Sequence, residues 1–165
     1  MSSCKNESGE AEDSETNQDT TAVVEREYKV LDSKNIDKDA QWAPFREEMA
    51  AFTEDRYNML SPLIMDKTIP EIQNSIRTGD FTYEELVKFY LQRIRKYDRD
   101  NNLSLNSIIS INPNIIEEAR AKDKEYQAGE MKHPIFGIPV LLKDNINTAN
   151  MPTTAGAVAL QNNNT

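Results

Sequence analysis

The residues best suited to chemistry in this sequence follow a short apolar run, in the stretch Gly137–Asn145, which reads GIPVLLKDN. The run is typical of a strand buried on both faces, with Leu141 and Lys143 on one side of it. Burial favours the neutral form of a lysine and lowers its pKa, so Lys143 could act as a general base or acid near neutral pH. Asp144 and Asn145 can turn the chain and supply local hydrogen bonds. The alternative is a lysine that only reaches solvent.

Three predicted elements position this lysine. A β-branched run at 105–111 and the apolar run at 135–142 each predict a strand. Between them, Asn112 and Pro113 predict the N-terminus of a helix that ends at Gly129. Strand, helix and strand form a βαβ unit, which favours an α/β fold with the site at the end of the second strand.

The preceding residues predict further helices. Aromatic and apolar residues between 40 and 60 recur at spacings of three to five, which favours one amphipathic helix. Two capping boxes, Thr68 with Glu71 and Thr82 with Glu85, predict the starts of two more helices. Gly79 predicts the end of the first of these.

From about residue 66 to 160, the chain resembles the opening of the amidase signature family. The strand sequence LNSII at 105–109, the block at 137–145 and the segment MPTTAG at 151–156 occur in the order found in that family. The block at 137–145 matches the family pattern Gly-Ile-Pro-x-x-x-Lys-Asp-Asn at each fixed position. The resemblance implies the family's α/β/α fold, a large mixed sheet flanked by helices, of which residues 40–165 would form the N-terminal part.

The resemblance also implies a mechanism, the hydrolysis of a non-peptide amide C–N bond by a Ser-cis-Ser-Lys triad. In that triad, the lysine that matches Lys143 relays protons through a bridging serine to the nucleophilic serine. None of the serines in this sequence matches the family's two serine blocks, so only Lys143 is assigned a catalytic role. We therefore expect a truncated piece that is inactive alone.

Residues 1–39 predict a disordered acidic tail or tether. Its first twenty residues hold six acidic residues and one basic residue, with no Val, Ile, Leu or aromatic residue, so they cannot bury a core. The single cysteine, Cys4, follows Met-Ser-Ser and would suit a lipidated lipoprotein terminus if an apolar signal preceded it, although an ordinary start is the simpler interpretation. With an ordinary start we expect the protein to be cytoplasmic. If Cys4 is lipidated, we expect it to be periplasmic and tethered to the membrane.

Composition excludes several functions. One cysteine and one histidine exclude cysteine clusters and paired-histidine motifs, so we expect no metal and no cofactor. A net charge of -9 argues against nucleic-acid binding, and no apolar run reaches the length of a membrane span. The expected partner is a small amide substrate, and the sequence does not define the oligomeric state.

Two other functions remain open. One is the A subunit of a glutamine-dependent amidotransferase, which shares the lysine block and works within a complex on transfer RNA. Those subunits usually carry an Arg-Thr-Thr segment where this chain has MPTTAG at 151–156. The other is a short non-enzymatic product.

Overall fold

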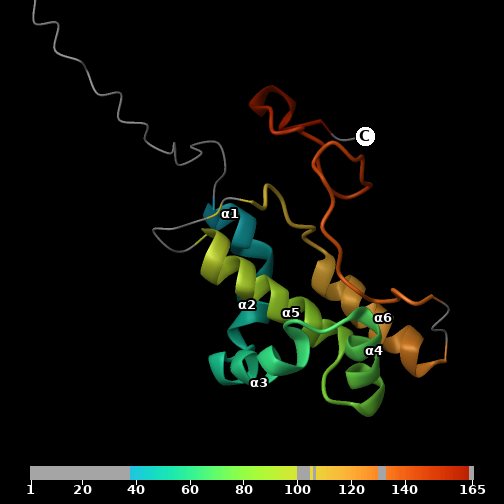
Figure 1. The fold of residues 1–165 in the computed structure, drawn as a ribbon. Helices are drawn as coiled ribbons and strands as arrows, with labels where there is room; N and C mark the ends of the chain where they lie inside the picture. Colours follow the sequence, from blue (N-terminus) through green and yellow to red (C-terminus); the bar gives the residue numbers. More distant parts are fainter. Residues whose placement is uncertain (1–37, 100–104, 106, 130–132, 164–165) are drawn as a thin grey trace, which may run out of the picture. The chain divides into compact units, whose positions relative to one another are not determined.

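The computed structural model describes residues 38–99, 105, 107–129 and 133–163, and Figure 1 shows their arrangement. The described chain is helical, with the order α1 (Lys38–Trp42), η1 (Ala43–Phe45), α2 (Arg46–Ala50), α3 (Glu54–Ile64), α4 (Ile69–Thr78), α5 (Tyr83–Ile94), the π-helical turn η2 (Arg95–Arg99), α6 (Ile115–Gln127) and η3 (Val158–Leu160). Within these ranges, no helix is both long enough and apolar enough to cross a bilayer. The predicted tail at 1–39, with Cys4, lies outside the described residues except for the first two residues of α1.

Both predicted capping boxes are confirmed. The backbone N–H of Thr68 donates to the Glu71 carboxylate at 2.7 Å at the start of α4. At the start of α5, the Thr82 hydroxyl accepts from the Glu85 N–H at 3.2 Å, and the Glu85 carboxylate accepts from the Thr82 N–H at 3.2 Å. Gly79 ends α4 in the left-handed region, with φ 83°. These bonds satisfy backbone groups that a helix end otherwise leaves without partners.

The single helix predicted between 40 and 60 is wrong. The chain instead forms α1, η1 and α2, and then breaks before α3. Thr53 is extended, with φ -74° and ψ 157°, and its hydroxyl accepts from the Arg56 N–H at 3.2 Å. Thr53 therefore caps a new helix, which the aromatic spacing alone did not indicate.

The start of α6 also differs from the prediction. The helix begins at Ile115 with Asn114 as its N-cap, two residues later than expected. The Asn112 side-chain oxygen accepts from the Asn114 N–H at 3.0 Å, so Asn112 forms a turn before the helix. The predicted end is confirmed, because Gly129 follows the last turn with φ 79°.

The two predicted strands are absent from the described residues, so this part of the chain lacks the predicted βαβ unit. Residues 134–137 form turns, and 107–111 and 138–142 have no regular secondary structure. A strand requires a ladder of backbone hydrogen bonds to a neighbour, and no such bond joins these two segments where the structure describes them. Val140, Leu141 and Leu142 are 64%, 77% and 50% exposed, and not buried on both faces as expected.

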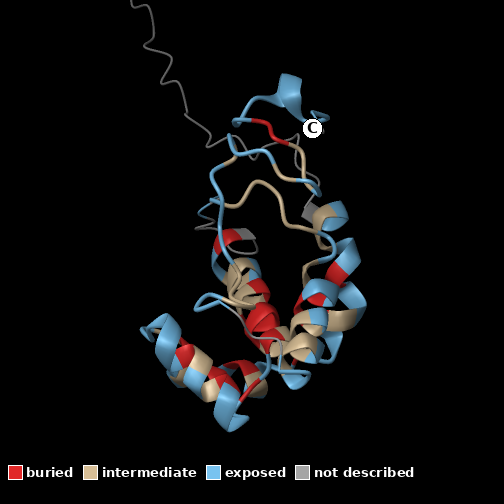
Figure 2. Cartoon of the chain, turned by 90° about the vertical axis from the view of Figure 1, so that its right-hand side faces the viewer, coloured by how far each residue is buried: buried red, intermediate tan, exposed pale blue. Residues whose placement is uncertain are grey.

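The core lies around α5, whose buried residues pack against α3 on one side and α6 on the other. Figure 2 shows these buried residues along the facing sides of the helices, whereas the segments after α6 are mostly exposed. The rings of Tyr57 and Phe89 stack with centroids 4.8 Å apart between α3 and α5. Tyr83 contacts the rings of Tyr126 and Phe136 edge to face. Apolar side chains on the facing sides of these helices thus form the core.

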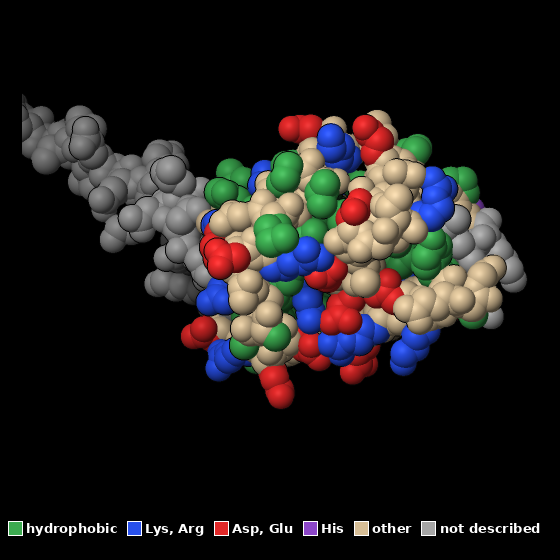
Figure 3. Space-filling model, turned by 90° about the horizontal axis from the view of Figure 1, so that it is seen from below, with side chains coloured by type: hydrophobic (Ala, Val, Ile, Leu, Met, Phe, Trp, Pro, Cys, Tyr) green, Lys and Arg blue, Asp and Glu red, His purple; other side chains and the backbone are tan. Residues whose placement is uncertain are grey.

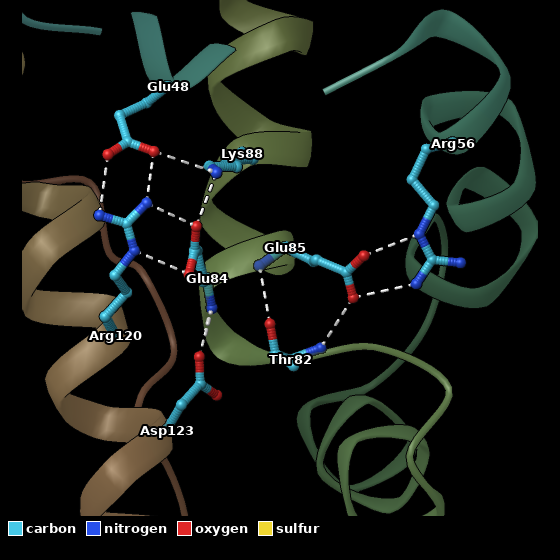
Figure 4. Close-up of polar contacts among 8 residues, drawn as sticks. All are labelled: Glu48, Arg56, Thr82, Glu84, Glu85, Lys88, Arg120 and Asp123. Atoms are coloured by element: carbon cyan, nitrogen blue, oxygen red, sulfur yellow. Dashed lines mark hydrogen bonds and ion pairs between the residues drawn. The ribbon is translucent and has the colours of Figure 1, made fainter. Parts of the chain in front are cut away.

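An ion-pair network joins α5 to α2 and α6 (Figure 4). Arg120 of α6 donates to both Glu84 oxygens at 2.9 Å and to Glu48 of α2 at 2.8 Å. The buried Lys88 lies 2.6 Å from Glu84 and 3.4 Å from Glu48. The Arg120 hydrogen bonds, aided by Lys88, hold the pKa of Glu84 below its ordinary value. The network therefore stabilises the fold above the unfolded pKa of a glutamate, about 4.3.

Glu84→Gln should lower the free energy of unfolding at pH 7 by about 1–3 kcal/mol, because it leaves the buried Lys88 with a weaker partner. Urea unfolding with circular dichroism measures the loss. Glu117→Gln is the control, because Glu117 also lies in the first turn of a helix but is exposed. Since the folded pKa of Glu84 is lowered, its stabilisation is lost as the pH falls through that value, and the two proteins should converge in acid. If Glu84→Gln and Glu117→Gln lost the same free energy of unfolding at pH 7, the ion-pair network would not stabilise the fold as stated.

Candidate active site

A pocket of about 230 Å³ lies between two segments that are distant in sequence. Residues 107–110 form one wall and residues from 141 to 152 form the other. The pocket has apolar groups on both walls and polar groups from Ser107, Ser110, Lys143, Asp144 and Thr148. Lys143 and Asp144, two of the three neighbouring site residues predicted from the sequence, therefore line one cavity. The third, Asn145, is exposed and does not line it.

The first wall is held by Asp98 of η2, whose side chain is buried at 3% exposure. Its carboxylate accepts from the Ser107 N–H at 2.7 Å, the Ser107 hydroxyl at 2.5 Å and the Ile108 N–H at 3.1 Å. From α1, the Gln41 amide donates to the Ile109 carbonyl at 2.8 Å. These bonds satisfy backbone groups of a segment that makes no ladder with 138–142.

The chain enters the second wall through Gly137, which lies against the buried ring of Tyr83. Gly137 has φ 69°, a conformation that favours glycine. The Tyr83 hydroxyl donates to Gln73 at 2.6 Å, and the Gln73 amide donates to the Phe136 carbonyl at 2.7 Å. Helices α4 and α5 thus fix the point from which the chain runs to Lys143.

Lys143 is exposed, and this differs from the burial predicted for it. No sheet forms over 138–142 in the described structure, so no neighbouring strand covers the lysine. Its backbone carbonyl accepts from the Ile146 N–H at 2.9 Å, which closes a turn directly after it. The structure places Lys143 in the lining of the pocket, with its side chain exposed.

Asp144 makes the most hydrogen bonds of the predicted residues. Its carboxylate accepts from the Thr154 hydroxyl in a short bond, and from the Thr154 and Gly156 N–H groups at 3.1 Å each. Its carbonyl accepts from the Ala155 N–H at 2.9 Å. The Thr154 hydroxyl is the main cause of a lowered Asp144 pKa, with the two N–H groups and the Lys143 charge adding to it. These partners lie ten to twelve residues further along the chain, so the predicted local bonds are in fact longer-range.

The serines of the pocket wall already have partners. Ser107 donates to Asp98, and the Ser110 hydroxyl contacts the Met151 sulfur at 3.9 Å. The described residues contain no group of three or more His, Cys, Asp or Glu side chains that could hold a metal. On the face shown in Figure 3, basic and acidic side chains are interspersed, with no stripe of one sign. This face does not have the basic patch typical of nucleic-acid binding.

Sequence reasoning missed Asp98 and assigned no role to Thr154. Asp98 had no visible signal, because an aspartate near a helix end is common and its partners follow after a gap of nine residues. Thr154 lies in the segment that carried the family resemblance, so its position was noted but its bond to Asp144 was not.

Comparison with known proteins relates the segment that contains the pocket to one family. Residues 85–165 match the family model described as Amidase, a range that includes the pocket and Lys143. A protein of Schizosaccharomyces pombe that is named as an amidase is 36% identical over 58% of this chain and 16% of its own length. The glutamyl-tRNA(Gln) amidotransferase A subunit of Nitrosococcus oceani is 33% identical over 58% of this chain and 19% of its own length. Over residues 85–165, the chain is therefore similar to the amidase family.

Solved structures show the same relation. An amidase family protein from Bacillus anthracis is similar with a TM-score of 0.68 and 38% identity, over 75% of this chain and 24% of that one. The peptide amidase of Stenotrophomonas maltophilia gives a TM-score of 0.58 and 38% identity, over 61% of this chain and 20% of that one. The aligned part therefore spans a quarter or less of each of these relatives.

Proposed function

We propose that this chain contributes Lys143 to an amide hydrolase of the Ser-cis-Ser-Lys type. One observation supports this most directly: Lys143 lines the pocket in a segment that matches the amidase family. In the proposed reaction, Lys143 takes a proton from a bridging serine, which takes one from the nucleophilic serine as that serine attacks the amide carbon. The proton then returns to the leaving nitrogen along the same route.

In this proposal, residues 40–165 form the N-terminal part of the amidase domain, and Asp144 and Asn145 support the turn after the lysine. The family's two serine blocks do not occur within the 165 residues. The 165-residue chain alone should therefore not hydrolyse amides.

A graft tests the proposal. Residues 66–160 of this chain replace the aligned segment of the S. maltophilia peptide amidase, which supplies the remaining machinery. We expect the folded chimera to release ammonia from a peptide amide, measured with a coupled assay. A chimera that folds, by circular dichroism and thermal melting, and has no activity would contradict the proposal.

The second candidate is an amidotransferase A subunit, favoured by the similarity to such proteins at 29–33% identity. Grafting the same residues into the N. oceani protein tests this function, with glutamine as the amide. Activity in the peptide amidase host and none in the amidotransferase host supports the hydrolase. The reverse result supports the amidotransferase and overturns our assignment.

A further inference from the structure

The loop at 151–156 faces the proposed catalytic turn and forms part of the same pocket. Met151 and Pro152 line the cavity on the wall that also carries Lys143. Thr153 and Thr154 follow, and both are buried at 8% exposure. Ala155 and Gly156 have φ 50° and 77°, in a region that an L-residue such as alanine adopts only at an energetic cost. Other contacts must therefore stabilise this backbone conformation of the loop.

The contacts show what holds it. Four hydrogen bonds join the loop to Asp144, three to its carboxylate and one to its carbonyl. The Thr154 hydroxyl is central, because it donates to the carboxylate and also accepts from the Gly156 N–H at 3.1 Å. A charged acceptor makes such bonds stronger than neutral ones.

From these contacts we propose that Thr154 is a positioning residue, which acts through Asp144 to hold Lys143 in a fixed relation to the pocket wall at Met151 and Pro152. The role in catalysis rests on the proposed function, but the mechanical link does not. Because Asp144 is covalently next to Lys143, any displacement of the loop is transmitted to the lysine backbone. Thr154 thereby couples the shape of the pocket to the place of the proton-transferring group.

Thr153 gives a matched control. It is next to Thr154 and equally buried, but its hydroxyl donates to the Ile146 carbonyl at 3.5 Å and not to Asp144. Replacing either threonine by valine keeps the shape of the side chain and removes one buried hydroxyl. A purely structural effect would be similar at the two positions.

The experiment uses the full 165-residue chain and needs no activity. Carbon-detected NMR follows the titration of the Asp144 carboxyl group, for which Lys143 is the charged neighbour that also lowers the pKa. In Thr154→Val, we expect the pKa of Asp144 to rise toward the ordinary value of about 3.9, with Thr154→Ser restoring the low value. In Thr153→Val, the pKa of Asp144 should stay low.

A second readout reports the position of the lysine. Competitive acetylation, quantified by mass spectrometry, compares the rate at Lys143 with that at the exposed Lys124. This ratio of acetylation rates should change at least about twofold in Thr154→Val, because the turn after Lys143 is no longer held. In Thr154→Ser, the ratio should return to the value of the unsubstituted chain. An unchanged Asp144 titration, or equal effects of both valine variants on either readout, would overturn the proposal. Neither outcome depends on whether the chain serves an amide hydrolase, so the two proposals can fail separately.

Discussion

Lys143→Met in the peptide amidase chimera should lower kcat by about 10²–10⁴-fold, the range that general acid–base groups contribute. Methionine has a similar length and lacks the group that exchanges protons, so the substrate can still bind. KM should therefore change little. Steady-state kinetics on the peptide amide, with thermal melting to show an intact fold, measures the effect.

Two further variants define the role of the lysine. Lys143→Arg keeps the positive charge but cannot lose it near neutral pH, so it should be nearly as inactive as the methionine variant if proton transfer matters. Activity in the arginine variant would indicate that only the charge is needed. Lys124→Met, at an exposed lysine of α6, should retain full activity. Full activity in Lys143→Met would remove Lys143 from the mechanism.

Gly137→Ala should destabilise the 165-residue chain by about 2–5 kcal/mol. A Cβ on Gly137 would lie 2.4 Å, 2.5 Å and 2.8 Å from three ring carbons of Tyr83. The ring cannot withdraw easily, because Tyr83 is fully buried and its hydroxyl donates to Gln73. Overpacking typically costs about 1–3 kcal/mol, and a left-handed alanine adds about 1–2 kcal/mol. Urea unfolding measures the sum.

Gly129→Ala separates the two contributions. Gly129 has φ 79°, close to the φ 69° of Gly137, but an added Cβ there meets no atom within 4 Å. Gly129→Ala should therefore lose only the free energy of unfolding that a left-handed alanine backbone costs. If both variants lose the same free energy, the close approach to Tyr83 contributes nothing, and the anchoring of the segment before Lys143 must be explained in another way.

The features predicted correctly from the sequence are those with local causes. Thr68, Thr82 and Gly79 mark helix ends because their partners lie within five residues along the chain. The strands at 105–111 and 135–142 were predicted from composition, but strand pairing depends on a distant neighbour that composition does not specify. Where the structure describes these two segments, their β-branched and apolar residues are present without the ladder.

The residues of the candidate site also fall into those with a local signal in the sequence and those that depend on distant partners. Lys143 and Asp144 were found from their place after the apolar run, and they do line the pocket. Asp98 and Thr154, which hold its two walls, act across nine or more residues and had no spacing rule to indicate them. The burial predicted for Lys143 relied on the missing strand pairing, and so it was wrong for the same reason as the strands.

The separations of the tertiary contacts also have a consequence for the order of folding. Arg56 bonds to Glu85 across 29 residues, whereas Gln73 bonds to Phe136 across 63. Short loops close at lower entropic cost, so we expect α3 and α5 to dock before the segment around Phe136 reaches α4. The turn after Lys143 can close by itself, because Asp144 bonds to residues only ten to twelve positions later.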